Sequence, residues 1–521
     1  MTKKTYLGFD FSTQQVKALA INDDLVVTHE ASVQFDTDLP EFKTEGGVHI
    51  HNDKLAVTAP TLMWVKALDL LLEKIKDTFD FSTVVALSGT GQQHGSVYWK
   101  EGALKKLQSL NAQYSLHDEL STAFSVNDSP IWMDSSTSDI CRNMEKSVGG
   151  PQKLADITGS RAYERFTASQ IAKLHQTKPD VYDNTERISL VSSFAASLFL
   201  GNYAAIDNSD GSGMNLLDIC KKDWSEECLA TTATNLRDKL GKPVPSCSNL
   251  GCISSYFVEK YGFNPDCRII AFTGDNPASL AGCHLGRGDV IISLGTSDTF
   301  MLWLDDPKPK TEGHVFVNPV DDNSYMGLLC YKNGSITREK IRNSAAQSWS
   351  EFSEILKHTK PGNNGKIGIY FDVQEITPNA VGFFRFNDKD EQVACFTDEE
   401  EVRAVIEGQF LAKRYHAEGL GYSLGISSKV LATGGASRNP EILQVLADVF
   451  GAPVYTLDTS NSACLGCAYR AKHGYLNGAK SFSEVTSSAA PYKLAAAPNT
   501  AVTYDIARYG KLEAVVTSKA N

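Results

Sequence analysis

The sequence predicts an α/β protein of two lobes with a cleft between them. The chain has 521 residues, which is more than one hydrophobic core usually supports. Strands repeatedly end in glycine-bearing corners that lead into helices, a pattern typical of α/β sheets. Both halves also open with a strand, a turn of small and hydroxyl residues and a second strand, around residues 8–13 and 294–299. We therefore expect an N-terminal lobe over residues 1–287 and a C-terminal lobe over residues 288–521.

Composition indicates an ordinary soluble protein that does not bind polyanions through its overall charge. Hydrophobic residues make up 42% and charged residues 21%, and the net charge is −12 without any long run of lysine or arginine. This balance argues against nucleic acid or an anionic membrane as a partner. The longest apolar segment, Ile188 to Leu200, is too short for a membrane span and predicts a buried helix. An anionic ligand such as a nucleotide would need amide dipoles and a divalent metal.

The cysteines indicate a reduced, cytoplasmic location. Eleven of them are scattered along the chain, which starts directly with a strand pattern. Such spacing is typical of intracellular thiols rather than of a disulfide framework. Cys464 and Cys467 form the one close pair, but their small-residue surroundings favour a closely packed helix over a metal or redox site. The oligomeric state is not specified by the sequence.

The first corner carries an acid and two hydroxyls. Asp10, Ser12 and Thr13 follow the strand pattern that contains Gly8, and a second strand pattern begins at Val16. This group is suited to holding a metal-bound phosphate through water, because Mg²⁺ needs few protein ligands. The alternative is a hairpin with a hydrophilic tip.

The next strand, from Val84, opens into a polar loop. Residues 88–95 resemble a dinucleotide fingerprint, but the glycines are spaced G-x-G-x-x-x-G, and residues 96–99 continue as a strand where the fingerprint needs a helix. The loop instead offers Gln92, Gln93 and His94 to a hydroxylated ligand. His94 could equally be a structural hydrogen bonder.

The corner at residues 268–280 places a single carboxylate between a strand and a helix. We expect Asn276 to cap the helix and Pro277 to begin it, which leaves Asp275 free for chemistry at the ligand-binding edge of the sheet. Soon afterwards, the turn Gly295-Thr296-Ser297 could present backbone amides to a phosphate. A base followed by a phosphate loop suggests a phosphotransferase, and the alternative is a capped helix and a tight turn.

A third corner follows the helix expected at residues 401–421. Gly434 and Gly435 allow the backbone to approach a flat or anionic ligand, and Asn439 with Pro440 predicts a second helix start. No sequence of the form G-x-x-x-x-G-K-[ST] occurs in the chain, which excludes a P-loop as the phosphate site.

Taken together, these motifs resemble those of the FGGY carbohydrate kinases, a family in the superfamily of actin and hexokinase. The matching segments are Gly8–Gln14, Gly91–Gly95, Gly274–Asn276, Ser293–Ser297, Val402–Gly408 and Ala432–Asn439. The resemblance implies a two-lobed actin/hexokinase-like (ribonuclease H-like) fold with an interdomain cleft. The segments at 161–166 and 348–350 are most similar to animal members that act on D-xylulose. The implied reaction is ATP-dependent phosphorylation of D-xylulose.

The resemblance also implies roles for single residues. Asp275 would be the catalytic base, and Asp10 would hold Mg²⁺ through water. The sugar would contact His94, Arg165, Asp275 and Asn276. ATP would contact Thr13, Gly295, Thr296, Gly435, Ala436 and Asn439, with Trp349 on the adenine side. From the residues alone, Arg161 or Arg165 could instead pair with Glu164.

The chain departs from the family on the sugar side. The usual Asp-x-Arg is Asp134-Ser135-Ser136 here, and Lys173 stands where many members have tryptophan. Another ketose or polyol, such as ribulose or glycerol, is therefore an alternative substrate. A non-catalytic, nucleotide-dependent interaction protein on the same fold is a second alternative.

Overall fold

The computed structural model describes residues 4–424, 428–457 and 461–518. The chain folds into two compact units. Unit 1 contains Met1–His284, Phe316–Asn323 and Thr459–Ala489, and unit 2 contains Leu285–Val315, Ser324–Asp458 and Ala490–Asn521. Two segments from the second half of the sequence thus belong to unit 1. Each unit therefore consists of several chain segments, whereas the expected lobes were two continuous segments that meet at residues 287 and 288.

Unit 1 is built on a twisted sheet with the strand order β12-β13-β6-β1-β2-β3, in which β14 also pairs with β6. Strands β1 (Thr5–Phe11) and β2 (Gln15–Asn22) form the expected hairpin, and β6 (Val84–Gly91) runs parallel to β1. β13 (Arg268–Ile270) and β14 (Thr273–Gly274) also run parallel to β6. The register pairs Phe11 with Gly91 and Gly91 with Gly274. Three strands therefore end side by side at one edge.

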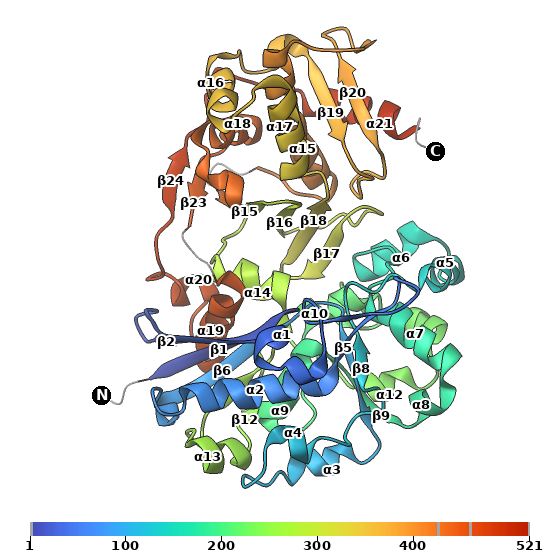
Figure 1. The fold of residues 1–521 in the computed structure, drawn as a ribbon, viewed down its shortest axis with the longest axis vertical. Helices are drawn as coiled ribbons and strands as arrows, with labels where there is room; N and C mark the ends of the chain where they lie inside the picture. The colour runs from blue at the N-terminus through green and yellow to red at the C-terminus, as the bar shows by residue number, and fades with distance from the viewer. Residues whose placement is uncertain (1–3, 425–427, 458–460, 519–521) are drawn as a thin grey trace. The chain divides into compact units, whose positions relative to one another are not determined.

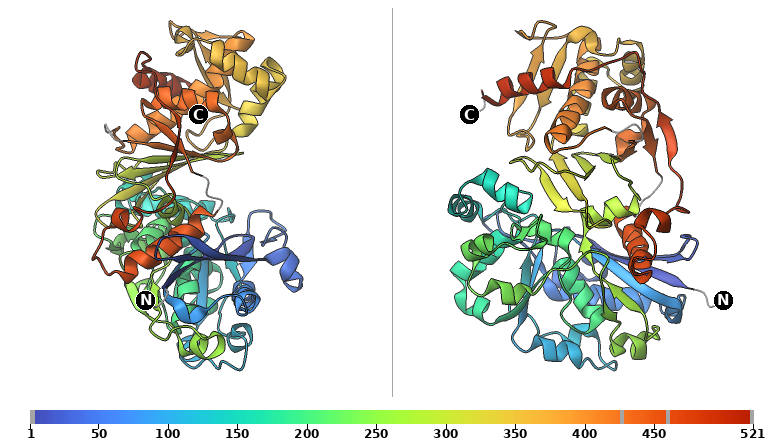
Figure 2. Two further views of the ribbon diagram at one scale, coloured as in Figure 1. Left: turned by 90° about the vertical axis from the view of Figure 1, so that its left-hand side faces the viewer. Right: turned by 180° about the vertical axis from the view of Figure 1, so that it is seen from behind.

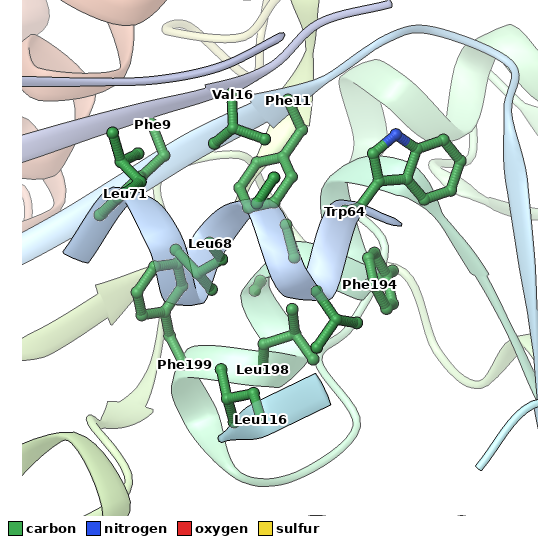
Figure 3. Packing of buried hydrophobic residues seen from close by; sticks show 14 of the residues in the cluster. Phe9, Phe11, Val16, Trp64, Leu68, Leu71, Leu116, Phe194, Leu198 and Phe199 are labelled. Atoms are coloured by element: carbon green, nitrogen blue, oxygen red, sulfur yellow. The ribbon is translucent and has the colours of Figure 1, made fainter. Parts of the chain in front are cut away.

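Helices α2 (Thr61–Ile75) and α9 (Val191–Leu200) supply much of the apolar core of this unit. Figure 3 shows Leu68 of α2 near Phe199 of α9 and Leu71 of α2 near Phe9 of β1, and all four residues are fully buried. The single helix expected from Ile188 is only partly correct. Strand β9 (Thr185–Leu190) comes first and pairs with β7 (Ser96–Lys100), so the helix begins at Val191.

Helix α19 (Ser462–Tyr475) lies beside β1 and against α14 (Asp275–Gly282), although hundreds of residues separate them in the chain (Figure 1). The backbones approach so closely that a Cβ at Gly282 would collide with the Ser462 carbonyl, and one at Gly466 with the Ala278 carbonyl. Cys464 donates a hydrogen bond through Sγ to the Gly8 carbonyl at 3.2 Å. The expected closely packed helix is confirmed, and all eleven cysteines are free thiols.

The remaining elements of unit 1 surround this sheet. The strands are β3 (Val27–Gln34), β4 (His49–Ile50), β5 (Val57–Pro60), β8 (Asp128–Pro130), β10 (Leu217–Asp218), β11 (Asp223–Trp224) and β12 (Asn249–Cys252). The helices are α1 (Phe35–Asp38), α3 (Ala103–Gln108), α4 (Leu116–Glu119), α5 (Ser138–Ser147), α6 (Pro151–Thr158), α7 (Thr167–Thr177), α8 (Pro179–Asp183), α10 (Asn208–Gly211), α11 (Glu226–Thr232), α12 (Leu236–Leu240), α13 (Ser255–Tyr261) and α20 (Phe482–Val485).

Unit 2 repeats the plan with a sheet in the order β17-β18-β16-β15-β22-β23-β24. β15 (Val290–Leu294) and β16 (Asp298–Leu304) form a hairpin, and β22 (Val430–Thr433) runs parallel to β15. Ser293 pairs with Thr433. The turn after β15 and the corner after β22 therefore share one edge, as the corresponding segments do in unit 1.

Further helices and the small sheet β19-β20-β21 complete unit 2, together with its C-terminal helix (Figure 2). The strands are β17 (His314–Val317), whose last two residues belong to unit 1, β18 (Tyr325–Tyr331), β19 (Ile367–Phe371), β20 (Gly382–Phe386), β21 (Gln392–Val393), β23 (Val454–Thr456) and β24 (Lys493–Ala496). The helices are α15 (Ser335–Ala345), α16 (Trp349–His358), α17 (Asp398–Gly419), α18 (Pro440–Phe450) and α21 (Ile506–Ser518). Across the described ranges of both units, no helix is long and apolar enough to cross a membrane.

The glycine contact between α14 and α19 gives a stability prediction. Gly466→Ala should lower the midpoint of thermal unfolding, because overpacking a tight backbone contact costs about 1–3 kcal/mol. The matched control is Gly419→Ala at the end of α17, where a Cβ meets nothing within 4 Å. That variant should keep or slightly raise the midpoint, since alanine favours helix. Equal midpoints for the two variants would contradict the close packing of α14 on α19.

Candidate active site

Asp275 lies at the edge where β1, β6 and β14 end. The expected cap is wrong in detail, because Gly274 is the N-cap and Asp275 is the first residue of α14. The Asn276 backbone N–H donates to Asp275 Oδ1 at 2.8 Å, and Asn276 Nδ2 donates to Gln93 Oε1, also at 2.8 Å. Asn276 therefore links the Asp275 corner to the polar loop after β6 instead of capping the helix.

The surroundings of Asp275 suit a general base. Burial raises the pKa of this carboxyl to about 7, the negative charge of Asp10 adds to the rise, and backbone hydrogen bonds from Asn276 and Gln93 oppose it. Its residue surface is nevertheless partly exposed. A carboxylate that exchanges its proton near neutral pH and remains accessible can take a proton from a bound hydroxyl.

Asp10 has the features expected of a ligand to a hydrated cation. It is 5% exposed, Ser12 Oγ donates to its Oδ2 at 2.6 Å, and its buried Oδ1 has no hydrogen-bond partner among the described residues. Burial raises the pKa of Asp10. An unpartnered buried carboxylate oxygen fits a Mg²⁺ ion that keeps its waters. Within the described part of the chain, no cluster of three or more His, Cys, Asp or Glu side chains forms an all-protein metal cage.

His94 occupies the loop between β6 and β7, and the strand at residues 96–99 confirms that this loop is not a dinucleotide fingerprint. Its backbone has a φ of 70°, a conformation that favours glycine. Its ring stacks on Phe166 with 4.2 Å between ring centres, and Nδ1 lies 2.8 Å from the Gly213 carbonyl. Burial, helped by the charge of Arg165, lowers the pKa of His94 to about 3. The imidazole is therefore neutral, with the proton on Nδ1 and Nε2 left as an acceptor.

Arg165 is held beside this histidine by aromatic rings. Its guanidinium lies 4.8 Å from the ring centre of Tyr163 and 5.7 Å from that of Phe166. Arg161 forms an ion pair with Glu145 on α5, with 2.9 Å between its Nε and Glu145 Oε1. The electrostatic effect of Arg165 on His94 places these two predicted sugar ligands near each other.

Sequence reasoning missed Asp210, an acid on the short helix α10. It is 2% exposed, Ser192 Oγ donates to its Oδ2 at 2.5 Å, and burial followed by the charge of Asp207 raises its pKa well above the usual value. A Cβ at Gly274 would stand 2.6 Å from Asp210 Oδ1 and 2.5 Å from Gln93 Cγ. The acid-rich turn was visible in the sequence, but nothing there showed its closeness to the Asp275 corner.

A pocket of about 700 Å³ in unit 2 gathers residues from four separate segments. Its lining includes the predicted nucleotide residues Gly295, Thr296, Trp349, Gly435, Ala436 and Asn439. Asn439 caps α18, as expected, by accepting the Glu441 and Ile442 N–H groups, and its Nδ2 donates to Ser353 Oγ at 2.8 Å. The volume is that of a small-molecule site. Thr13 lies in unit 1, where its hydroxyl accepts a hydrogen bond from Trp132 Nε1 at 2.9 Å.

The two departures from the family pattern contact each other in the structure. Lys173 Nζ donates to Ser136 Oγ at 2.6 Å, and Gln170 Nε2 donates to Asp134 Oδ1 at 2.8 Å. The substituted positions thus form one polar group on α7 and the loop before α5.

Comparison with known proteins identifies relatives along the whole chain. Sequence models of the FGGY family of carbohydrate kinases match residues 125–282 with the N-terminal domain and residues 290–475 with the C-terminal domain. The chain is 60% identical to a xylulose kinase of Rattus norvegicus, covering 99% of this chain and 98% of that protein. It is 49% identical to xylulose kinase 2 of Arabidopsis thaliana over 90% of this chain and 87% of the relative.

Solved structures agree on the fold. A xylulose kinase from Rhodospirillum rubrum matches with a TM-score of 0.78 and 16% identity, covering 99% of both chains. A glycerol kinase from Plasmodium falciparum, solved with ADP, matches with a TM-score of 0.72 and 16% identity over 99% of this chain and 97% of that one. These likenesses confirm the expected actin/hexokinase-like fold.

Proposed function

The chain belongs to the FGGY family of carbohydrate kinases, and we propose that it transfers the γ-phosphoryl group of ATP to D-xylulose, giving D-xylulose 5-phosphate and ADP. The names of its 60% and 49% identical relatives support this substrate. The observation that carries the chemistry is Asp275, a partly exposed carboxylate with a pKa of about 7 at the end of the unit 1 sheet.

In this proposal Asp275 is the general base. A terminal hydroxyl of the sugar gives its proton to the carboxylate while its oxygen forms a bond to the γ-phosphorus, and the bond to the β-phosphate bridging oxygen breaks. Phosphoryl transfer needs little else than alignment and charge stabilisation, so a single base is sufficient. Expulsion of water from the active site on substrate binding would limit hydrolysis of ATP.

The sugar would be held by the residues around the polar loop. Neutral His94 would accept a hydrogen bond from a sugar hydroxyl at Nε2, because Nδ1 donates to the Gly213 carbonyl. Arg165 and Asn276 would donate to the remaining oxygens. These contacts orient the ketose so that one hydroxyl meets Asp275.

The nucleotide would occupy the unit 2 pocket. Trp349 would lie against the adenine, with Gly435, Ala436 and Asn439 along the nucleoside and Gly295 and Thr296 near the phosphates. Thr13 is a further proposed contact to the phosphates. Asp10 fits a water-mediated Mg²⁺ site, and a bound Mg²⁺ would neutralise charge on the phosphates.

We further propose that the enzyme acts in the cytoplasm on small molecules alone. Free thiols throughout the chain support a reducing compartment, and a net charge of −12 disfavours nucleic acid and anionic membranes as partners.

The direct test is an activity screen of the purified protein with ATP, Mg²⁺ and about ten ketoses and polyols, with coupled detection of ADP. D-xylulose should give the highest kcat/KM. A preference for ribulose or glycerol would instead favour the alternative substrates that the departures from the family pattern leave open. ATP turnover that ignores every sugar would contradict the proposed reaction.

Removing the base should stop turnover without preventing nucleotide binding. Asp275→Ala should lower kcat by at least about 10² to 10⁴, the usual contribution of a general base, while the Kd for ADP stays near the wild-type value. The control is Asp69→Asn, which removes another buried carboxylate of unit 1 that accepts hydrogen bonds from the Leu116 and His117 backbones. That variant should lose stability but keep its kcat. Near-normal turnover of Asp275→Ala would rule out Asp275 as the base.

The pH dependence of kcat/KM for the sugar should follow the ionisation of Asp275. Asp275 accepts a proton only when ionised, and its raised pKa means that the ionised fraction falls below about pH 7. We therefore expect kcat/KM for the sugar to drop about tenfold per pH unit on the acid side of pH 7 and to level off above it. His94, with a pKa of about 3, stays neutral across this range and cannot supply the acid limb. Activity that stays constant down to pH 5 would contradict an ionised Asp275 as base.

His94→Ala should act on the sugar alone. We expect the KM for D-xylulose to rise and the KM for ATP to change little, because the imidazole belongs to the proposed sugar contacts. The control is His473→Ala, a histidine on α19 whose pKa is lowered mainly by burial. A defect confined to ATP would show that His94 is wrongly placed on the sugar side.

A further inference from the structure

Three charged side chains are buried beside the turn Gly295–Ser297 in unit 2. Arg338 on α15 donates two parallel hydrogen bonds to Asp298, from Nη1 to Oδ2 at 2.9 Å and from Nη2 to Oδ1 at 3.0 Å. Lys413 Nζ on α17 lies 3.0 Å from the same Oδ2. The three side chains are 0%, 0% and 1% exposed. Because desolvation offsets most of the attraction in such a cluster, stability alone explains it poorly.

The cluster reaches the turn through Arg338. Nη2 also donates to the Gly295 carbonyl at 3.2 Å, and the Ser335 N–H donates to the same oxygen at 2.9 Å. Gly334 packs closely against the turn, since a Cβ at this position would lie 2.6 Å from the Thr296 carbonyl oxygen and 2.8 Å from the Gly295 carbonyl oxygen. The first residues of α15 therefore fix the peptide between Gly295 and Thr296.

Fixing this carbonyl also fixes an amide. In a trans peptide the C=O and the following N–H point in opposite directions, so the Thr296 N–H points away from the atoms that hold the Gly295 oxygen. Among the described residues the Thr296 N–H donates no hydrogen bond within the protein, and Thr296 is exposed at the pocket wall. A free backbone donor that is already oriented toward the pocket suits an anionic ligand.

We propose that Arg338, held by Asp298 and Lys413, is a positioning residue that presets the Gly295–Thr296 peptide so that the Thr296 N–H meets the phosphates of the nucleotide. Arg338 is among the residues that line the pocket, but its side chain is 0% exposed, so it acts through the Gly295 carbonyl rather than by direct contact with ATP. The inference rests on the proposed kinase function and deepens it on the nucleotide side. Its benefit is preorganisation, because the donor needs no rearrangement when phosphate charge shifts during transfer.

The test compares two substitutions of Arg338 with a matched control. Arg338→Met removes the guanidinium group and all its hydrogen bonds. Arg338→Lys keeps a positive charge, but its single ammonium group cannot bind Asp298 and the Gly295 carbonyl together. The control is Arg385→Met, which removes a largely buried partner of Glu401 in the same unit that does not line the pocket. For each protein we would measure the thermal midpoint, the Kd for ADP, and the KM values for ATP and sugar.

Arg338→Met should weaken ADP binding and kcat/KM for ATP about tenfold or more, the usual effect of losing hydrogen bonds to a charged group. The KM for sugar should stay within about twofold. Arg338→Lys should keep more of the thermal midpoint yet show a nucleotide defect of similar size. Arg385→Met should lose stability without any change in nucleotide affinity.

Two results would overturn the inference. One is wild-type ADP affinity in Arg338→Lys, and the other is a defect in Arg338→Met that falls equally on the sugar and ATP constants. Failure of the proposed function looks different, because the wild-type protein itself would then fail to phosphorylate any sugar.

Discussion

The proposed chemistry depends on keeping two carboxylates, Asp10 and Asp275, at the end of one sheet. Asp10 is the second-last residue of β1, and Asp275 comes directly after β14. Both strands run parallel to β6. Burial raises the pKa of Asp275 and the negative charge of Asp10 adds to the rise, so Asp275 can exchange a proton near neutral pH. Two carboxylates in a poorly solvated region repel each other, and this arrangement persists only because rigid elements surround it.

Much of unit 1 serves as that support. The glycine-mediated contact of α19 with α14 fixes the helix that begins at Asp275, although α19 comes from near the end of the sequence. Gly274 leaves space for Asp210 and Gln93, and Asn276 bonds to Gln93. Unit 2 uses the opposite design at the corresponding edge. There a buried ion cluster holds the turn that carries the Thr296 N–H, a donor that is free among the described residues and suited to a negatively charged ligand rather than to removing a proton.

The sequence could predict the corners because strand patterns, glycines and Asn-Pro pairs act locally. The hairpins at β1–β2 and β15–β16 and the Asn439 cap are confirmed for this reason. The Asn276 cap is wrong because a tertiary partner, Gln93, takes its side chain. Asp210 and the Asp298–Arg338–Lys413 cluster could not be predicted, since their meaning lies in contacts between distant segments. The assignments of single sugar and nucleotide ligands stay predictions that rest on family resemblance and on the contacts described above.

A structure of the protein with ADP, Mg²⁺ and D-xylulose would test the central claim most directly. We predict that one terminal hydroxyl of the ketose lies within about 2.6–3.2 Å of an Asp275 carboxylate oxygen and that this hydroxyl faces the β-phosphate of ADP. A sugar bound elsewhere, or a hydroxyl whose only acceptor is a side chain other than Asp275, would contradict it.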